Sequence, residues 1–337
     1  MPGGDSRSVS GMRAAVGIDF GGTNVQAVVV DEAGGVLADG VWPTPREGPA
    51  VADLVAGIVA SLDVEGLPLG IGAPVLLDGD GIVVAAPNLP SVIGTDFGRS
   101  VRSRLTEMNR NPAALVVDND ATLAAVGELE LGCAAGSRDA VVVTLGTGIG
   151  AGLIVNGQVI RGANGFAGEA GHMVVDTAGP PCPCGRNGCW ERFASGTGLA
   201  RLARDAAHAG RATRVVELAG GDPEAVRGEQ VSLACAEGDP EARAIMSAFG
   251  WWVALGLANL CLLLDVELCV IGGGLVGSGD FLLAPVREHF AEFMEPATGG
   301  TGRVVPRPVA QIVLASLGSR AGAVGAAWSA WKAVGGR

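Results

Sequence analysis

Short apolar runs that end in glycine-rich turns recur along the chain. Residues 14–20 and 25–30 are two such runs, separated by Gly21-Gly22-Thr23 and followed by an acidic Gly-Gly turn at 31–35. Two apolar runs around a glycine tip are typical of a β-hairpin. The rest of this half has the spacing of strands at 69–73 and 114–117 and of helices at 50–62, 97–108 and 121–131, with a Pro/Gly-rich irregular region up to Pro90.

The second half of the chain starts with the same unit. Residues 140–145 form an apolar run, Gly146-Thr147-Gly148-Ile149-Gly150 forms a glycine-rich turn, and 151–155 form the next run. A further apolar strand at 268–271 leads into Gly272-Gly273-Gly274. The repeated strand–turn–strand unit, with helices interleaved in each half, predicts two related α/β domains that face each other across a cleft.

Domain boundaries follow from this organisation. We expect a flexible tail at 1–12, a small N-terminal α/β domain at 13–125, which a C-terminal helix near 318–333 would complete, and a large α/β domain at 126–317. The most apolar segment, 251–264, is shorter than the ~20 residues that span a membrane and is interpreted as a buried helix. The polar segment 210–238 is interpreted as helices with loops, and its sequence indicates no function.

Composition narrows the class of protein. The chain has 337 residues, is 48% hydrophobic and 17% charged, and has a formal net charge of −12. It can bury a sizeable core, and its acidity argues against nucleic acid or an anionic membrane as a partner. The Gly/Ser-rich start lacks the apolar segment of a signal peptide, so we expect a cytoplasmic protein. An odd number of cysteines, seven, favours free thiols or metal ligands over a disulfide framework.

The strongest chemical signal is a cysteine cluster. The sequence Cys182-Pro-Cys184-Gly-Arg-Asn-Gly-Cys189 follows His172, and its prolines and glycines allow a tight loop. Three thiolates and one imidazole suit tetrahedral Zn²⁺, and the absence of a further nearby ligand type indicates a closed, structural site. The alternative, three unrelated buried thiols, does not account for the clustering. The remaining cysteines, Cys133, Cys235, Cys261 and Cys269, are interpreted as core residues.

Three glycine-rich loops indicate nucleotide binding less specifically. In Asp19-Phe20-Gly21-Gly22-Thr23, the missing Cβ atoms let backbone N–H groups approach a phosphate, and the carboxylate can hold Mg²⁺ through water. Gly146–Gly150 and Gly272–Gly274 have the same character. A plain hairpin turn needs glycine just as much, so each loop alone leaves both interpretations open. None fits a P-loop or opens a dinucleotide-binding unit.

Several carboxylates lie at the start of the predicted helix 121–131 or beside the cysteine cluster. Asp118-Asn119-Asp120 lies between a strand and a helix, where Asp118 or Asn119 can cap the helix while Asp120 serves as a general base for a substrate hydroxyl. Glu169 lies three residues before His172, and Glu191 two residues after Cys189. A metal loop would bring these two acids together to bind sugar hydroxyls, although exposed loop acids without a ligand fit equally well.

Taken together and in order, these elements resemble the ROK family of sugar kinases and regulators. The resemblance covers about residues 14–330 and rests on Gly17–Thr23, Asn119-Asp120-Ala121, Gly165–His172 and Cys182–Glu191. Within the family, the bacterial ATP-dependent glucokinases look most similar. The combination of the Glu-x-Gly-His motif with the cysteine loop is far more specific than any single glycine loop.

The resemblance implies an actin/hexokinase-like (ASKHA) fold, with two α/β domains that have mixed sheets around a central cleft and close on sugar and ATP. Asp120 would be the catalytic base, which takes the proton from the sugar 6-hydroxyl as it attacks the γ-phosphate. It implies structural Zn²⁺ on His172, Cys182, Cys184 and Cys189 in a zinc loop at 172–191, with the other side of His172 turned toward the sugar. Besides Asp120, the implied sugar contacts are Asn88, Asn119, Glu169, His172 and Glu191. The implied contacts of ATP, which brings Mg²⁺, are Asp19, Gly21, Gly22, Thr23, Thr144, Gly146, Thr147, Gly148, Gly272, Gly273 and Gly274.

The expected activity is ATP-dependent phosphorylation of a hexose at its 6-hydroxyl, with glucose as the substrate, in a homo-oligomer (dimer or tetramer). Two positions depart from the glucokinase pattern: Thr122 stands where Asn is usual, and Ala73-Pro74-Val75 replaces a glycine-containing turn. Both lie near the expected sugar pocket, so N-acetylmannosamine or N-acetylglucosamine stays open as the substrate. A non-catalytic sugar-responsive regulator is the other class. Only 16 residues precede Gly17, so we do not expect the DNA-reading helices of the family's repressors.

Overall fold

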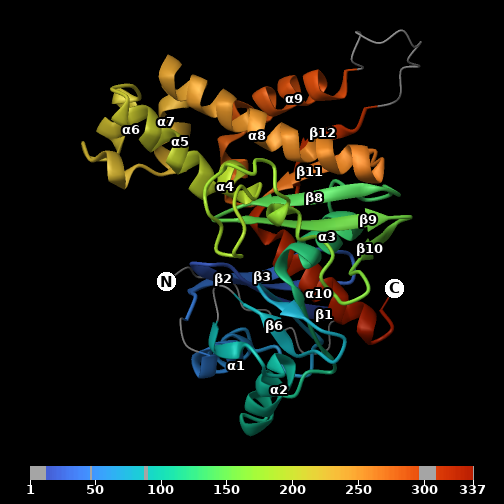
Figure 1. Cartoon of the computed structure of the whole chain (residues 1–337). Helices are drawn as coiled ribbons and strands as arrows, with labels where there is room; N and C mark the ends of the chain where they lie inside the picture. Colours follow the sequence, from blue (N-terminus) through green and yellow to red (C-terminus); the bar gives the residue numbers. More distant parts are fainter. Residues whose placement is uncertain (1–12, 46–47, 87–89, 296–308, 337) are drawn as a thin grey trace. The chain divides into compact units, whose positions relative to one another are not determined.

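A computed structural model describes residues 13–45, 48–86, 90–295 and 309–336 (Figure 1). They divide into two compact units. The first unit contains the described residues up to Ala135, a segment at Val159–Ala167 and the residues from Arg320 onward. The second unit contains Gly136–Gln158 and Gly168–Ser319. The first unit thus extends beyond residue 125, where we expected its boundary, and it includes the C-terminal helix.

The first unit is built on a five-stranded mixed sheet in the order β3-β2-β1-β4-β7. The predicted hairpin is present, because β1 pairs antiparallel with β2. Strand β1 also pairs parallel with β4, and β4 pairs parallel with β7, so the carboxyl ends of these three strands share one edge of the sheet. The strands are β1 (Ala14–Phe20), β2 (Asn24–Asp31), β3 (Val36–Pro43), β4 (Leu69–Ala73) and β7 (Leu115–Asn119).

Helices cover both faces of this sheet. Side chains alternate between the faces of a strand, so Val16 and Leu69 face α1 and α2, while Gly17 and Gly70 face α10. A Cβ at Gly17 would overlap the carbonyl oxygen of Ala323 in α10, so this helix packs directly on the strand backbone. The helices are α1 (Gly48–Ser61), α2 (Phe97–Glu107), α3 (Asp120–Leu131) and α10 (Ala321–Ala333), with a 3₁₀ turn η1 (Pro90–Val92).

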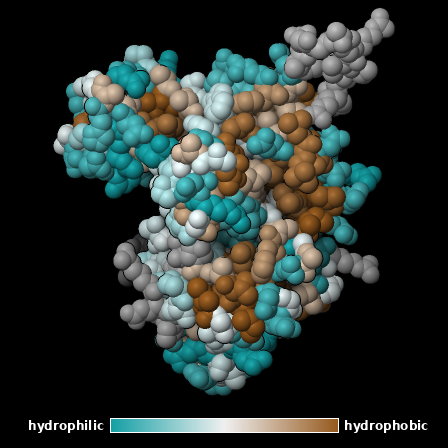
Figure 2. Space-filling model, viewed as in Figure 1, coloured by the Kyte–Doolittle hydropathy of each residue, from teal (hydrophilic) through white to brown (hydrophobic). Residues whose placement is uncertain are grey.

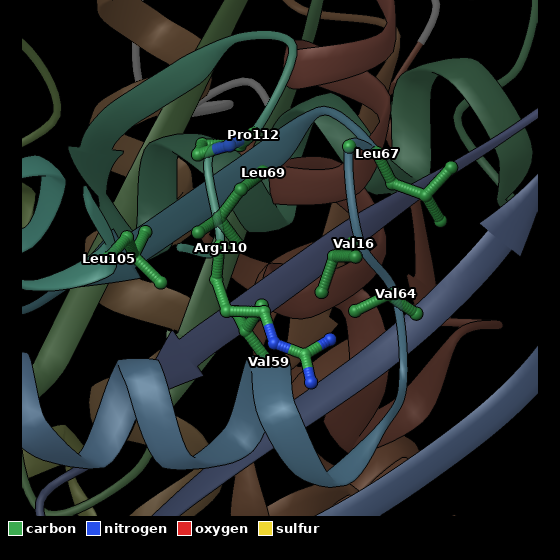
Figure 3. Close-up of a pocket in the computed structure, with 9 residues that line it drawn as sticks. Val16, Val59, Val64, Leu67, Leu69, Leu105, Arg110 and Pro112 are labelled. Atoms are coloured by element: carbon green, nitrogen blue, oxygen red, sulfur yellow. The ribbon is translucent and has the colours of Figure 1, made fainter. Parts of the chain in front are cut away.

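The region expected to be irregular up to Pro90 contains a short antiparallel pair, β5 (Leu76–Leu77) and β6 (Val83–Ala85). A pocket between α1, α2 and the sheet has a volume of about 10 Å³, at most enough for one water molecule (Figure 3). Its lining is apolar apart from Arg110, and it contains none of the candidate site residues. We therefore assign it to packing.

The second unit is built on a second five-stranded mixed sheet in the order β10-β9-β8-β11-β12. Strand β8 pairs antiparallel with β9 and parallel with β11, which pairs parallel with β12. The strands are β8 (Ala140–Leu145), β9 (Ile149–Val155), β10 (Gln158–Ile160), β11 (Leu268–Gly272) and β12 (Gln311–Leu314). The other elements are α4 (Glu191–Ala194), α5 (Gly196–His208), α6 (Thr213–Leu218), α7 (Gly228–Ala236), α8 (Pro240–Leu264) and α9 (Asp280–Met294), with 3₁₀ turns η2 (Ala170–His172), η3 (Pro223–Ala225), η4 (Gly274–Ser278) and η5 (Gly318–Arg320).

Helix α8 begins at Pro240, earlier than the apolar run at 251–264 indicated. Asp239 caps it by accepting the N–H of Ala242 at 2.7 Å, and proline is favoured at the first helical position. By length and composition the helix is able to cross a membrane, but half of its most apolar window is buried inside the structure. Phe249, Val253 and Leu257 lie in the core of the second unit, as expected for a buried helix.

Candidate active site

Two carboxylates meet at the carboxyl edge of the first unit's sheet. Asp19 lies in β1 and Asp120 opens α3 directly after β7. Gly72 of β4 leaves room for both, since a Cβ built there would be 3.0 Å from Asp19 Oδ1 and 3.5 Å from Asp120 Cα. A Cβ at Gly322 would overlap Asp19 Oδ2. Small residues on two neighbouring elements therefore create the space for this acidic pair.

Ionisation of the Asp19 side chain is unfavourable in its buried, acidic surroundings. Burial raises its pKa well above the ordinary value, and the nearby negative charge of Asp120 raises the pKa further. Its Oδ1 is buried and has no hydrogen-bond partner among the described residues. A buried carboxylate oxygen without a donor fits a position that binds a cation or a cation's water ligand.

Asn119 and Asp118 are fixed by hydrogen bonds. Asn119 Oδ1 accepts the N–H of Thr122 at 3.0 Å and so caps α3, as one interpretation of the sequence expected. Its Nδ2 donates to the carbonyl of Val75 at 3.4 Å. Asp118 Oδ2 accepts from Arg161 Nε and Nη2, both at 2.8 Å. Asn119 therefore contacts both positions, 122 and 75, at which this sequence departs from the glucokinase pattern.

The first glycine-rich loop, Gly21–Thr23, connects β1 to β2 and is attached to the end of β3. Thr44 Oγ1 donates to the carbonyl of Gly21 at 2.7 Å, and the Thr44 N–H donates to the carbonyl of Thr23 at 2.9 Å. The loop itself is mostly exposed, and a Cβ at Gly22 would meet nothing within 4 Å. The backbone of this loop is thus hydrogen-bonded to Thr44, while space is open next to Gly22.

In the second unit, two glycine-rich loops follow neighbouring parallel strands. Thr144 in β8 pairs with Gly272 in β11, so the loops at 146–148 and 272–274 leave the same edge of the sheet. Gly273 has φ +85°, and a Cβ there would lie 2.5 Å from the carbonyl oxygen of Leu145. Only glycine permits this approach of the two chains. The second and third loops are therefore neighbours in space.

The predicted metal ligands form a compact cluster in the same unit. The ligand atoms of His172, Cys182, Cys184 and Cys189 all lie within 4.8 Å of one another. His172 Nδ1 is 3.7 Å from Cys182 Sγ, and the Sγ atoms of Cys184 and Cys189 are 3.5 Å apart. At a tetrahedral zinc, two sulfurs are about 3.8 Å apart and sulfur and nitrogen about 3.5 Å. The donor set and its spacing fit a zinc ion.

The thiols of this cluster influence one another's ionisation. Burial, together with hydrogen bonds that the Cys189 thiol donates to its neighbours Cys184 and Cys182, raises the pKa of Cys189 to about 12, and burial also raises the pKa of Cys182. For Cys184, burial raises the pKa, but hydrogen bonds with the Arg186 backbone and with the other thiols outweigh it, so that the pKa is lowered. Without a cation, three adjacent thiolates repel one another, and a bound metal would deprotonate them together.

The cysteine loop is anchored to the body of the second unit. Cys182 N–H donates to the Arg186 carbonyl at 2.8 Å, and Gly188 has φ +67° with its Cα against Asp176. Trp190 is fully buried, and its Nε1 donates to the Trp252 carbonyl in α8 at 2.7 Å. The loop thus has its own turn structure and one large hydrophobic anchor.

Two carboxylates, Glu169 and Glu191, flank the cluster. His172 Nε2, on the side away from Cys182, lies 3.7 Å from Glu169 Oε2. Glu191 Oε1 accepts from Cys182 Sγ at 3.6 Å, and Glu191 Oε2 accepts the N–H of Ile149 at 3.2 Å, next to the second glycine loop. Burial raises the pKa of Glu169, and the Glu191 charge raises it further, while His172 lowers it. One carboxylate, Glu191, therefore contacts both the cysteine cluster and the glycine loop.

The sequence-predicted residues thus form two groups, one in each unit. The first unit brings together Asp19, Asp120, Asn119 and the loop Gly21–Thr23. The second unit brings together the cysteine cluster, Glu169, Glu191, Thr144 and both other glycine loops. Asn88 lies outside the described residues.

Three residues that hold these groups in place were not predicted: Thr44, Thr197, which donates to the Thr147 carbonyl at 2.8 Å, and Arg161. No local pattern marks them, because their partners are distant in the sequence.

Comparison with known proteins finds similar bacterial glucokinases. The glucokinase of Streptomyces coelicolor is 37% identical over 321 residues, which cover 94% of this chain and 97% of that protein. The glucokinase of Halalkalibacterium halodurans is 32% identical over 93% of both chains. The structure of a ROK family glucokinase from Streptomyces griseus in complex with glucose and AMPPNP is similar, with a TM-score of 0.83, 36% identity and coverage of 95% of this chain and 99% of that one.

The fold is therefore that of the ROK glucokinases and hexokinases, of the actin/hexokinase-like class, as expected. The family model described as "ROK family" matches residues 15–333. Because this match spans nearly the whole chain and contains both groups of site residues, the chain belongs to the ROK family.

Proposed function

We propose that this protein is an ATP-dependent hexose kinase that transfers the γ-phosphate of ATP to the 6-hydroxyl of glucose. The observation that carries the proposal is the position of Glu191. Its two carboxylate oxygens contact the cysteine cluster at 3.6 Å and the second glycine loop at 3.2 Å. A carboxylate that can accept hydrogen bonds from sugar hydroxyls is thereby adjacent to a loop of the kind that binds phosphates, which phosphoryl transfer requires.

The sugar-binding role is proposed for Glu169, His172, Glu191 and Asn119. Carboxylates accept hydrogen bonds from sugar hydroxyls, and an imidazole whose Nδ1 is bound to a metal still donates from Nε2. The Nε2 of His172 faces Glu169, which fits this arrangement. Asn88 is proposed for the same role by its place in the family motif.

We assign structural zinc to His172, Cys182, Cys184 and Cys189. The donor types and their spacing support it. A zinc ion held by these four residues would supply rigidity, since four protein ligands would leave no position for a substrate. The residues around it do the binding: His172 and Glu191 are held in fixed orientations by the same loop.

For the transfer step, we propose Asp120 as the general base that accepts the proton of the 6-hydroxyl. Its Oδ1 accepts the N–H of Ala121 at 2.9 Å, which orients the carboxylate at the start of α3. The glycine loops present backbone N–H groups to the phosphates, and Asp19 supports the Mg²⁺ that accompanies ATP. The buried, unpartnered oxygen of Asp19 supports this role. No covalent enzyme intermediate is needed, because the sugar oxygen attacks phosphorus directly.

The test is ADP formation by the purified protein with Mg-ATP and a panel of glucose, mannose, fructose, allose and N-acetylhexosamines. Asp120→Asn should abolish a sugar-dependent rate without lowering the thermal midpoint. Asp39→Asn removes an exposed carboxylate from the same sheet and should keep the wild-type rate. Saturable sugar binding with no turnover on any sugar would instead assign the protein to the regulatory class.

The panel also tests which sugar is used. Thr122 and Val75, at the two departures from the glucokinase pattern, both bond to Asn119. A shift of Asn119 changes the hydroxyls or the acetamido group that a sugar pocket accepts. A rate with N-acetylmannosamine or N-acetylglucosamine far above that with glucose would replace glucose as the proposed substrate.

We also propose a cytoplasmic homo-oligomer, a dimer or tetramer. None of the seven cysteines forms a disulfide in the structure, which fits a reducing compartment. On the face shown in Figure 2, apolar residues gather at the C-terminal end of α8, where Leu262 is 61% and Leu263 77% exposed. Large apolar side chains on a surface favour association. Light scattering of the wild type and of Leu263→Glu measures the mass; a monomer in both would refute the oligomer.

A further inference from the structure

In each unit, one threonine hydroxyl holds a glycine-rich loop from outside the loop. In the first unit, Thr44, which follows β3, donates to the carbonyl of Gly21 at 2.7 Å. In the second unit, Thr197, in the first turn of α5, donates to the carbonyl of Thr147 at 2.8 Å. Both threonines are distant in sequence from the loops that they contact, and neither belongs to a motif that identifies the family here.

These bonds set the direction of the next N–H group. In a planar trans peptide, the carbonyl of one residue and the N–H of the next point in opposite directions, and no described peptide is cis. A Gly21 carbonyl held toward Thr44 therefore points the Gly22 N–H away from it. Likewise, a Thr147 carbonyl held toward Thr197 points the Gly148 N–H away from α5.

The N–H groups oriented in this way are available for a ligand. Among the described residues, the N–H groups of Gly22, Thr147 and Gly148 donate to no protein acceptor. The Thr147 N–H is oriented by a related bond, since the Gly196 N–H at the start of α5 donates to the Gly146 carbonyl at 2.7 Å. Successive unpaired N–H groups on one side of a loop form an anion-binding concavity.

Without these bonds, each loop has an alternative conformation that disfavours phosphate. Glycine-rich peptides flip easily, because no Cβ restricts their dihedral angles. A flipped Gly21–Gly22 or Thr147–Gly148 peptide would present a carbonyl oxygen, instead of an N–H, to an anion. The threonine hydroxyl stabilises the productive orientation before ligand arrives, which lowers the cost of binding.

We propose that Thr44 and Thr197 are positioning residues for the phosphates of ATP: each donates to a loop carbonyl and so keeps the opposite face of the loop lined with N–H donors. This inference rests on the proposed function, since it takes the two loops to bind ATP. It adds two residues that would contact neither phosphate nor sugar and would act by orienting the loops.

The test compares variants that differ in the hydroxyl alone. Thr44→Val and Thr197→Val remove the donor at nearly constant shape, whereas Thr44→Ser and Thr197→Ser keep it. Thr106→Val is the matched control, because Thr106 lies on the exposed face of α2 and its Oγ1 is within hydrogen-bond distance of the Arg102 carbonyl (2.9 Å) and of Asn111 Oδ1 (2.8 Å). Calorimetric titration with Mg-AMPPNP, AMP and glucose gives the affinity of each variant, and thermal unfolding gives its stability.

We expect each Val variant to weaken AMPPNP binding by about 3-fold to 10-fold, the value of one net hydrogen bond. AMP, which lacks the outer phosphates, and glucose should bind as to the wild type, and the Ser variants should bind AMPPNP normally. Thr106→Val should change none of these affinities. AMPPNP affinity within twofold of the wild type in both Val variants would overturn the proposal, as would an equal loss for glucose.

A Val variant without a cooperative thermal transition is replaced by the Ala variant at the same position, for which the expectations are the same. Failure of the proposed function and failure of this inference give different results. A wild-type protein that binds no AMPPNP refutes the proposed function. A wild type that binds AMPPNP, with Val variants that bind it equally well, refutes only the role of the threonines.

Discussion

A single methyl group added at Gly148 should separate glucose binding from folding. A Cβ there would overlap Glu191 Oε2, and Glu191 has the Cys182 thiol at 3.6 Å on its other oxygen. The carboxylate must therefore move by about 1 Å, which is enough to misalign a binding group. Gly148 does not have a positive φ, so alanine fits its backbone. The atom that must give way is the end of a flexible side chain, so the fold should tolerate the change.

The magnitude follows from the hydrogen bond that Glu191 would lose. A hydrogen bond between a neutral hydroxyl and a carboxylate contributes about 1.5–3 kcal/mol, or about 10-fold to 150-fold in Kd. We expect Gly148→Ala to weaken glucose binding by that factor, as measured by calorimetry without nucleotide, with a thermal midpoint close to that of the wild type.

Gly146→Ala is the matched control for glucose binding. It adds the same methyl group to the same loop, but a Cβ there would meet nothing within 4 Å. Any general effect of stiffening the loop is common to both variants, so their difference reports the displacement of Glu191. Equal glucose affinity in the two variants would refute the reasoning, and with it the proposed role of Glu191.

Three other predictions concern metal, charge and packing. Cys184→Ser should lower zinc content, glucose affinity and thermal midpoint together; a metal-free variant with unchanged affinity and midpoint would contradict this. Asp19→Asn should raise the midpoint of the nucleotide-free protein at pH 7, by about 2–4 °C per kcal/mol of relieved repulsion, while activity is lost. The pKa of Asp19 is raised in the folded state, so ionised Asp19 destabilises the fold once the pH rises above the pKa that Asp19 has in the unfolded chain. The higher midpoint of Asp19→Asn should therefore vanish near pH 4. A higher midpoint that persists at pH 4 would refute charge burial as its cause. Gly17→Ala should destabilise by about 1–3 kcal/mol through overlap with α10, whereas Gly57→Ala, exposed in α1, should not; equal denaturation midpoints would argue against the close packing.

The sequence by itself determined what depends on short-range pattern. The strands at 69–73 and 140–145 have the predicted bounds, and the cysteine cluster is compact as its spacing indicated. Periodicity, turn residues and ligand spacing are local properties, so neighbouring residues suffice to define them. The same reasoning placed the start of α8 too late, because the cap at Asp239 lies outside the apolar run. It also missed β5 and β6, whose strands are too short to give a period.

Only the tertiary structure decided which of these local features meet. Strand order brings Asp19 next to Asp120 and puts the loop at 272–274 beside that at 146–148, because parallel strands share their carboxyl edges. The hydroxyls of Thr44 and Thr197 reach their loops through contacts between residues far apart in the chain. A hydrogen bond of this kind depends on the register and packing of whole elements, and no pattern within a short stretch of sequence specifies it.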